Sequence, residues 1–525
     1  MRKIIVFAVS IVVMLAIAAC GGGSGGSGSV LVDEVPASNH ESTNQDDPQS
    51  GNQNQDNYDY PDMPTNEPLS GDLTISAFDS IMMGPFLEQA AELFTYKHPD
   101  VNITVESFSA VPEMMEIEME DGTTAQVMRV EGGPHQHRDY INQVNTELMS
   151  GRGPDILTLD ILPFHRYAMM RHLANLQTLM DNDPNFNTGD YRANILDAIT
   201  SEDGLFKFPI TIDFSYLTFD SSLFTPAQKS ALLENDTFTV EELFDIARPA
   251  LEDAHTNGNE HLMMALPEFM LFLRMFDLYQ GHFIDIHNRQ ANFTDGIFVE
   301  MLNQIKRFSD AGYLHGDWAD NVRTLGGTAA TERYFYGLNP NLMLFNEFNR
   351  DDPVRWAMDF SGRISDDDLI AGLLKNSFGQ VPFALGERMG GAAFGINANS
   401  PNQALAWEFI KFLSSYALME LIQSPGGIPL HVGALEEVTR RWATNAIFSE
   451  QQGESIELTA AEQARFDAYM ETVDHFMSLF NTFNVTDTII RDMVIEAVRE
   501  FFDGDISAED LANRLQSSIH LVLNE

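Results

Sequence analysis

The segment that most constrains the fold runs from Ala393 to Leu413, because it joins a short apolar strand to a strongly marked helix. Its first four residues, 393–396, are apolar and suit a buried strand. Ser400 is predicted to cap the helix, Pro401 to be its first residue, and Gln403 to complete a capping box. Apolar residues then recur at helical spacing, which predicts a buried stripe made of Ala406, Phe409, Ile410, Leu413 and Ala417.

The N-terminus predicts an exported protein. A basic start at residues 1–3 precedes an apolar run that is shorter than the ~20 residues of a membrane-spanning helix. Small residues then lead to Cys20, the only cysteine of the chain, and the sequence IAAC at 17–20 resembles a bacterial lipoprotein signal box. This resemblance implies a signal peptide over 1–19, lipidation of Cys20, and a protein anchored to the cell membrane and facing outside.

The segment 20–70 is predicted to be a disordered tether. It is rich in Gly, Ser, Asn, Gln, Asp and Pro, and contains no Lys or Arg. Such a composition buries too little apolar surface to offset the entropy lost on ordering. About fifty flexible residues have an r.m.s. reach of roughly 40 Å, so the folded part would stay near the membrane but move freely.

The charge of the chain excludes one class of partner. It has 30 Lys and Arg residues against 78 Asp and Glu residues, which gives a formal net charge of −48. Binding to nucleic acid depends on clusters of Lys and Arg that neutralise phosphates. We therefore expect neither a nucleic-acid partner nor adsorption to anionic lipid.

The folded part begins with a predicted βαβ unit. Residues 73–78 and 101–108 are typical of strands, and apolar spacing from Phe86 to Phe94 indicates a helix between them. Ligands of open α/β sheets bind at the carboxyl ends of parallel strands. Asp79 and Ser80, directly after the first strand, are therefore candidate ligand contacts, although a polar turn and helix cap would account for them equally well.

Three segments of the chain resemble bacterial extracellular solute-binding proteins of family 1, the maltose-binding-protein-like substrate-binding lipoproteins of ABC transporters. They are NTELMSGRGPDILTLD from Asn145, GLFKFPITIDFSYLTF from Gly204 and GINANSPNQALAWEFIKFL from Gly395. The resemblance implies an α/β, two-lobed periplasmic-binding-protein-like fold. Each lobe would hold a mostly parallel sheet flanked by helices, and several crossing strands would join the lobes.

The resemblance also implies how the chain divides between the lobes. Crossings are expected near Asp213, Asn346 and Phe394, on the pattern of the family. The expected division assigns 71–212 and 338–392 to lobe I, and 213–337 and 393–525 to lobe II.

Ligand contacts are implied on the same grounds. Asp213 falls where the family places a sugar-binding carboxylate, which can accept two hydroxyls at once, although a salt-bridged hinge residue is the alternative. Aromatic rings at Phe348 and Trp356 would pack on the C–H face of a sugar, and Arg388 would donate to a ligand or form a hinge salt bridge. The complete expected set is Asp79, Ser80, Asp160, Phe164, Asp213, Phe214, Asn346, Phe348, Trp356 and Arg388.

The function implied by the resemblance is capture of a carbohydrate, with an oligosaccharide as the expected class, and its delivery to the membrane permease of an ABC importer. No cofactor or catalytic residue is expected, and no metal, since His135 and His137 in the 113–138 insertion have no third ligand nearby. The chain lacks the G-x-S-x-G and H-E-x-x-H motifs. A lipid-anchored glycoside hydrolase, which needs only a carboxylate pair, and a sugar receptor without a transport role are the alternatives.

Overall fold

The structure is a computed structural model that describes residues 69–78, 83–108, 113–118, 124–129, 134–201, 203–212, 214–258, 261–264, 266–314, 343–349, 368–383, 392–421, 427–451, 458–483 and 487–524. The predicted signal peptide, Cys20 and nearly all of the predicted tether lie outside these ranges. The described part is organised around two five-stranded sheets, each with its own large hydrophobic core.

The first sheet has the strand order β2-β1-β5-β16-β6. Its strands β2, β1 and β5 are parallel, and β16 runs antiparallel to both of its neighbours. The sheet is therefore mixed rather than mostly parallel. Its strands are β1 (Ser70–Phe78), β2 (Asp100–Phe108), β5 (Ile156–Thr158), β6 (Phe208–Pro209) and β16 (Ala393–Ile396).

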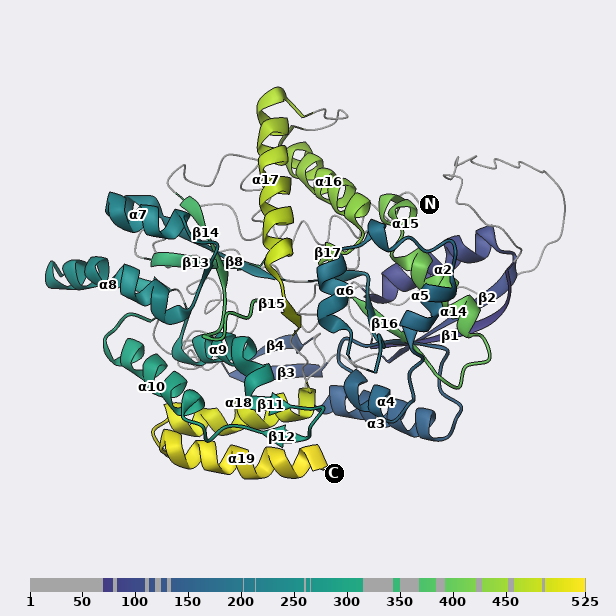
Figure 1. The fold of residues 1–525 in the computed structure, drawn as a ribbon, viewed down its shortest axis with the longest axis horizontal. Coiled ribbons are helices and arrows are strands. Elements are labelled where there is room, and N and C mark those ends of the chain that lie inside the picture. The colour runs from purple at the N-terminus through teal and green to yellow at the C-terminus, as the bar shows by residue number, and fades with distance from the viewer. Residues whose placement is uncertain are drawn as a thin grey trace. The chain divides into compact units, whose positions relative to one another are not determined.

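Helices cover both faces of the first sheet, because side chains along β1 alternate between two cores. Leu73, Ile75 and Ala77 belong to the large core with helices α2 (Met83–Lys97) and α14 (Gln403–Leu413). Phe78, on the other face, packs with helix α3 (Pro134–Met149). Figure 1 shows β1 with α2 on one side and α3 on the other. The predicted βαβ unit is confirmed as β1, α2 and β2.

The first core extends far along the sequence. Its remaining helices are α5 (Leu176–Asn182), α6 (Ala193–Ile199), α15 (Tyr416–Leu421), α16 (Val432–Gln451) and α17 (Ala460–Leu479). Helix α4 (Phe164–Met169) packs with α3 on the other face of the first sheet. A two-stranded pairing joins β7 (Thr211–Ile212) to β17 (Ile428–Pro429).

The second sheet has the order β10-β13-β8-β14-β9 and is also mixed. The central strand β8 is antiparallel to β13 and β14, which are parallel to β10 and β9 respectively. The strands are β8 (Ser215–Asp220), β9 (Thr237–Phe238), β10 (Leu262–Met264), β13 (Met343–Asn349) and β14 (Asp368–Leu374). The helices beside them are α7 (Pro226–Leu233), α8 (Val240–Thr256), α9 (Glu268–Phe283), α10 (Ile297–Asp310), α18 (Thr488–Phe502) and α19 (Ala508–Asn524), with the hairpin β11 (Ile284–Asp285) and β12 (Gln290–Ala291).

Among the residues that the structure describes, the chain passes between the first and second cores within three segments. Along β8, Tyr216 packs in the first core and Leu217 in the second. The chain returns from the second core to the first between Ala371 of β14 and Val381. It passes from the first core to the second again between Phe480 and Ile490. Strand β15 (Pro382–Phe383), directly after the return segment, pairs in parallel with β18 (Thr482–Phe483) in the last segment.

Two predicted crossings were wrong. The strand expected to return to the first lobe at Asn346 is β13, which lies inside the second sheet, and β14 lies there too. The strand at Phe394 is β16, which lies inside the first sheet and not at a crossing into lobe II. Local apolar patterning predicted the strands correctly, but it contains no information about which sheet a strand joins.

Helix caps were predicted with mixed success. Thr239, at the start of the apolar pattern of α8, caps this helix and forms a capping box with Glu242. Helix α14 begins at Gln403, later than predicted, and Asn402 is its N-cap. The Ser400 hydroxyl instead accepts from the Asn402 amide and donates to Asp155 on the loop before β5. The long-range bond to Asp155 therefore replaced the local capping box.

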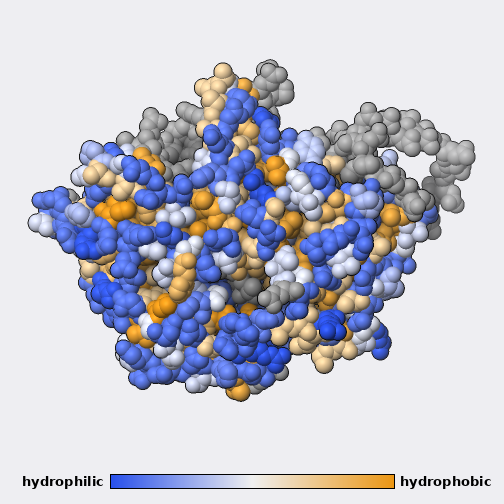
Figure 2. Space-filling model, in the orientation of Figure 1, coloured by the Kyte–Doolittle hydropathy of each residue, from blue (hydrophilic) through white to orange (hydrophobic). Residues whose placement is uncertain are grey.

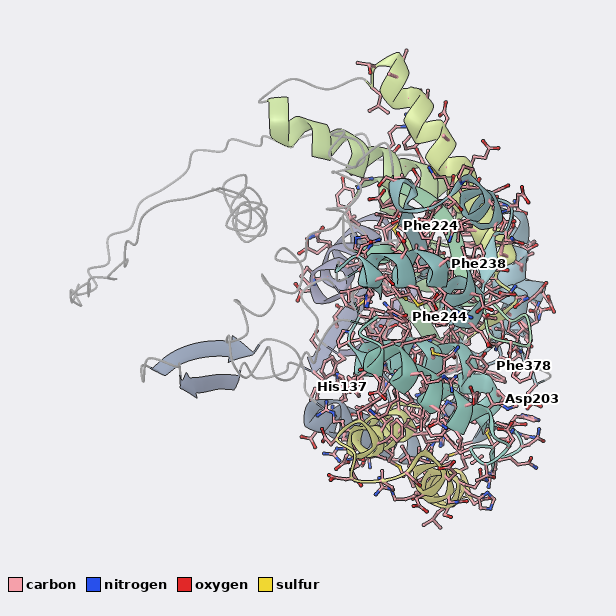
Figure 3. All side chains as sticks on the ribbon, turned by 90° about the vertical axis from the view of Figure 1, so that its left-hand side faces the viewer. His137, Asp203, Phe224, Phe238, Phe244 and Phe378 are labelled. Carbon is pink, nitrogen blue, oxygen red and sulfur yellow. The ribbon has the colours of Figure 1, made fainter. Side chains whose placement is uncertain are left out.

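The structure describes part of the insertion at 113–138. Its backbone forms the antiparallel hairpin β3 (Glu113–Glu118) and β4 (Thr124–Arg129), and α3 begins at Pro134. Figure 3 draws this hairpin to one side of the other elements. No helix among the described residues is long and apolar enough to cross a bilayer. The face drawn in Figure 2 is mostly hydrophilic with scattered apolar spots.

The packing of α14 generates a stability prediction. Phe409 is fully buried, and its ring packs edge-on against Phe94 of α2 at 5.2 Å between centroids. We expect Phe409→Ala to lower the free energy of unfolding by about 3–5 kcal/mol, because it leaves a cavity between two helices. Urea denaturation followed by circular dichroism would measure the change. Leu521→Ala, at a position that is 61% exposed, is the control and should change stability by less than about 0.5 kcal/mol.

Candidate ligand-binding site

The carboxyl end of β5 carries a carboxylate with unusual surroundings. Asp160 is partly exposed, and one of its oxygens accepts from the Ala393 amide of β16 at 3.2 Å. Burial among neighbouring atoms raises the pKa of Asp160 to about 7, although Lys207 and the Ala393 amide oppose that rise. A carboxylate that is reachable but poorly hydrated gains strongly from hydroxyl donors, so Asp160 is suited to bind a polar ligand.

A buried lysine lies beside Asp160. Lys207 is only 3% exposed, and its Nζ donates to the Leu159 carbonyl at 3.1 Å. The same Nζ lies 4.8 Å from the centre of the Phe164 ring and 5.6 Å from that of Phe483. The arrangement places a carboxylate, an ammonium group and half-buried aromatic rings within one small region, which is the mixture that sugar sites use.

The two cores are joined next to this region by a buried ion pair. Asp487 is 1% exposed, and Arg166 of α4 donates to its Oδ2 from Nε at 2.9 Å. The Nε2 atom of His165 lies 3.3 Å from the same oxygen. The other oxygen of Asp487 accepts from the amides of Ile489 and Ile490 and so caps α18. One carboxylate thus holds a helix of the second core and a helix at the edge of the first.

The pKa values of this group follow from its surroundings. Burial alone would raise the pKa of Asp487, but His165, Arg166 and the Ile490 amide outweigh it and hold the pKa at about 2. Burial lowers the pKa of His165 despite its contact with Asp487. At neutral pH the imidazole is therefore neutral, and Arg166 supplies the positive charge of the pair.

His137 lies at the end of β1 and feels the charge of a residue on α18. The ring of His137 on α3 is 5.0 Å from that of Phe78, and burial lowers the pKa of His137 against the negative charge of Asp492 on α18. Within the described ranges no three His, Cys, Asp or Glu side chains are grouped as metal ligands would be. The side chain of His135 lies outside the described part.

The structure places only some of the predicted ligand contacts. Asp160 and Phe164 lie together at the junction of the cores, both close to Lys207. Phe214 is 5% exposed and packs against Phe480 at 5.0 Å, so the structure gives it a role in the first core. Five of the predicted residues lie outside the described part, namely Asp79, Ser80, Asp213, Trp356 and Arg388. Asn346 and Phe348 are described by their backbone alone, opposite Thr218 and Tyr216 in the second sheet.

The sequence analysis missed Lys207, His165, Arg166 and Asp487. Lys207 could have been found, because it stands between two phenylalanines in an apolar stretch, which predicts that it is buried. A buried lysine needs a polar or charged partner, so such a position is a candidate for a binding site. Arg166 and Asp487 carried no such signal, since they are 321 positions apart and each looks like an ordinary surface charge.

Family models of protein sequence give no match to this chain. Solved structures do match it along most of its length. An extracellular solute-binding protein of family 1 from Alicyclobacillus acidocaldarius matches with a TM-score of 0.52 at 14% identity, over 87% of this chain and 99% of that one. An ABC substrate-binding protein from Listeria monocytogenes in complex with cycloalternan matches with a TM-score of 0.51 at 13% identity, over 87% and 99% of the two chains.

A periplasmic oligogalacturonide-binding protein from Yersinia enterocolitica has a TM-score of 0.54 at 13% identity, over 86% of this chain and 99% of that one. De novo designed esterases are also among the matches. At these identities the likeness concerns the fold. The chain has the two-lobed α/β fold of extracellular solute-binding proteins, as the sequence resemblance implied.

The buried pair at Asp487 generates a pH prediction. The folded pKa of about 2 lies below the ~3.9 of an unfolded aspartate. The carboxylate therefore contributes about 2 kcal/mol of stability above about pH 4, and this is lost as the pH falls toward 2. We expect Asp487→Asn, which retains a good helix cap, to remove that contribution at neutral pH and flatten the acid limb of the stability profile.

Urea denaturation repeated across this pH range would measure both effects. Asp220→Asn is the matched control, because Asp220 also accepts from a backbone amide, that of Ser222, but at an exposed turn. A variant Asp487→Asn with an unchanged acid limb would contradict the assigned role of the ion pair.

Proposed function

We propose that this protein is a lipid-anchored extracellular solute-binding protein of an ABC importer, and that it captures a carbohydrate between its two lobes. The observation that carries the proposal is the cluster at the junction of the two cores, where Asp160, Lys207 and the Phe164 ring lie together. A carboxylate accepts sugar hydroxyls, an ammonium group donates to them, and an aromatic face covers the apolar side of the ring.

The position of the Asp160 cluster favours a mechanism in which the two lobes close around the ligand. Its residues stand beside the contacts that bring α4, which packs on the first sheet, to the start of α18 in the second core. A ligand that contacts both lobes would bind more tightly when they are close, and would shift the population toward that state. The permease of the importer would then recognise the closed form.

The net charge narrows the class of carbohydrate. A protein with a formal net charge of −48 repels anionic ligands at a distance, so neutral sugars are favoured over acidic ones. Two of the matched structures are, by their descriptions, a complex with cycloalternan and an oligogalacturonide-binding protein. They support a carbohydrate as the ligand, and the charge of this chain favours a neutral oligosaccharide.

The hydrolase alternative is less favoured by the described residues. A retaining or inverting glycosidase needs a second carboxylate across the scissile bond from its general acid. The raised pKa of Asp160 would suit an acid, but both oxygens of Asp487 are already engaged by Arg166 and by the start of α18. A sugar receptor without a transport role would have the same binding site. It would differ from a transport protein only in the partner that recognises it.

Binding should depend on Asp160 and on pH. We expect Asp160→Asn, and Asp213→Ala at the implied family position, each to weaken binding about tenfold or more, since a charged hydrogen bond contributes roughly 1.5–3 kcal/mol. Affinity of the native protein should rise as the pH increases through about 7, because Asp160 becomes an ionised acceptor. This pH dependence should be absent from Asp160→Asn, and Asp220→Asn should behave like the native protein.

A thermal-shift screen of residues 71–525 against neutral mono- and oligosaccharides would find the ligand, and calorimetry would measure these affinities. A ligand at 100 times its Kd should stabilise the protein by about 2.7 kcal/mol. Chromatography of the incubated sugar separates the alternatives, because consumption of a bound sugar would support the hydrolase. Absence of any stabilising sugar would contradict the carbohydrate class.

The anchor can be tested in cells. We expect Cys20→Ser to release the protein from the membrane fraction, because the ~0.8 kcal/mol of each buried lipid CH₂ group is lost with the acyl chains. Ser24→Ala, in the same glycine-rich segment, is the matched control and should leave the protein in the membrane fraction. Retention of Cys20→Ser in that fraction would contradict lipidation at this residue.

A further inference from the structure

A crevice that the proposed site does not use lies between α9 and two of the segments that link the cores. Its volume is about 330 Å³, which is at the lower end of the ~300–1,000 Å³ of small-molecule sites. The side chains that line it include Leu278, His282, Phe378, Gln380, Thr482 and Phe483. It therefore combines two aromatic rings with an imidazole, an amide and a hydroxyl group.

The aromatic ring at the edge of this crevice is exposed on a rigid support. Phe378 is 51% exposed, although the turn that carries it is tightly held. Asn376, which is 1% exposed, donates from Nδ2 to the Leu278 carbonyl at 2.9 Å, and its Oδ1 accepts from the Phe378 and Gln380 amides. Gly379 completes the turn at a φ of +75°, where other residues would be strained. An apolar ring fixed in this way is preorganised for contact with a ligand.

Polar groups line the crevice beside this ring. The imidazole of His282 lies 4.7 Å from the Phe378 ring centre and tilted by 30°. Its Nε2 is paired with Asp295 at 2.5 Å, and Asn292 also donates to that carboxylate at 3.1 Å. The Gln380 Oε1 accepts from Asn376 at 2.7 Å, so the amide plane is held with its NH₂ group as a donor for other partners. These groups have fixed orientations and suit hydroxyl donors and acceptors.

The crevice lies apart from the end of β1, and it shares the Phe483 ring with the surroundings of Lys207. Figure 3 shows Phe378 and His137 on opposite sides of the molecule. His137 marks the end of β1, because its ring is 5.0 Å from Phe78. The crevice therefore lies on a different side of the molecule from the end of β1.

We propose that this crevice is a second carbohydrate site, which binds one pyranose ring of a neutral sugar. The exposed face of Phe378 packs on the C–H face of the ring, and His282, Gln380 and Thr482 bind its hydroxyls. A single ring has few contacts, so its affinity is lower than that of the oligosaccharide at the main site. The inference stands independently of the main site, because none of the groups that it assigns to the sugar lies in the Asp160 cluster.

Methyl NMR spectroscopy of the full chain tests this site directly, since Leu278 and Thr482 both carry methyl groups that line it. The probes are the methyl glycosides of glucose, galactose and mannose, titrated to their solubility limit. At least one should shift the Leu278 and Thr482 methyl signals in a saturable way. Phe378→Ala should weaken that binding about tenfold, the effect of losing one aromatic contact.

Two further variants sharpen the test. Phe378→Leu keeps an apolar side chain but removes the flat face, and should weaken binding nearly as much as Phe378→Ala. Tyr96→Ala removes a ring that is 69% exposed at the end of α2, and should change nothing. The inference is overturned if no glycoside moves these two methyl signals, if only methyl groups near Asp160 move, or if both Phe378 variants bind like the native protein. The last two outcomes would leave the proposed main site intact.

Discussion

The arrangement of the two lobes depends on one buried carboxylate. Asp487 has both oxygens engaged, one with the first amides of α18 and the other with Arg166 of α4. Asp487 is only 1% exposed. If it lost either Arg166 or the amides of α18, part of its charge would be buried without a partner, which would destabilise the fold. The folding of α18 and the approach of α4 are therefore coupled through a single side chain. Any opening of the lobes at this point has to hydrate that charge or find it another partner.

Two aspartates near the same junction show how surroundings decide chemical behaviour. The pKa of Asp487 is held at about 2 by its cation and amide partners, whereas burial raises that of Asp160 to about 7. The first is a structural anion that stays ionised and is already satisfied. The second has one backbone donor and a nearby ammonium group, and it remains partly exposed. A ligand can thus improve the surroundings of Asp160, while it could only disturb those of Asp487.

The linking segments also supply aromatic side chains to the crevice between them and α9. The turn that carries Phe378 is fixed by buried Asn376, and the parallel pair of β15 and β18 lies in the same part of the chain. Phe483 of β18 contributes to the first lobe through the Phe164 ring, 6.1 Å away, and also lines the crevice. The passage between the lobes is therefore built from aromatic side chains, which keep it rigid while offering surfaces to ligands.

The sequence by itself determined several local elements and led to the fold. Apolar periodicity predicted the βαβ unit, because such patterns act over a few residues, and the family resemblance of three segments implied the two-lobed fold. Tertiary structure alone decided that β13 lies in the second sheet and β16 in the first, and that Ser400 binds Asp155 instead of closing a capping box. It also decided the pairing of Arg166 with Asp487 and the different ionisation of two aspartates. Those outcomes depend on which distant segments share a low-dielectric space, and no local pattern encodes that.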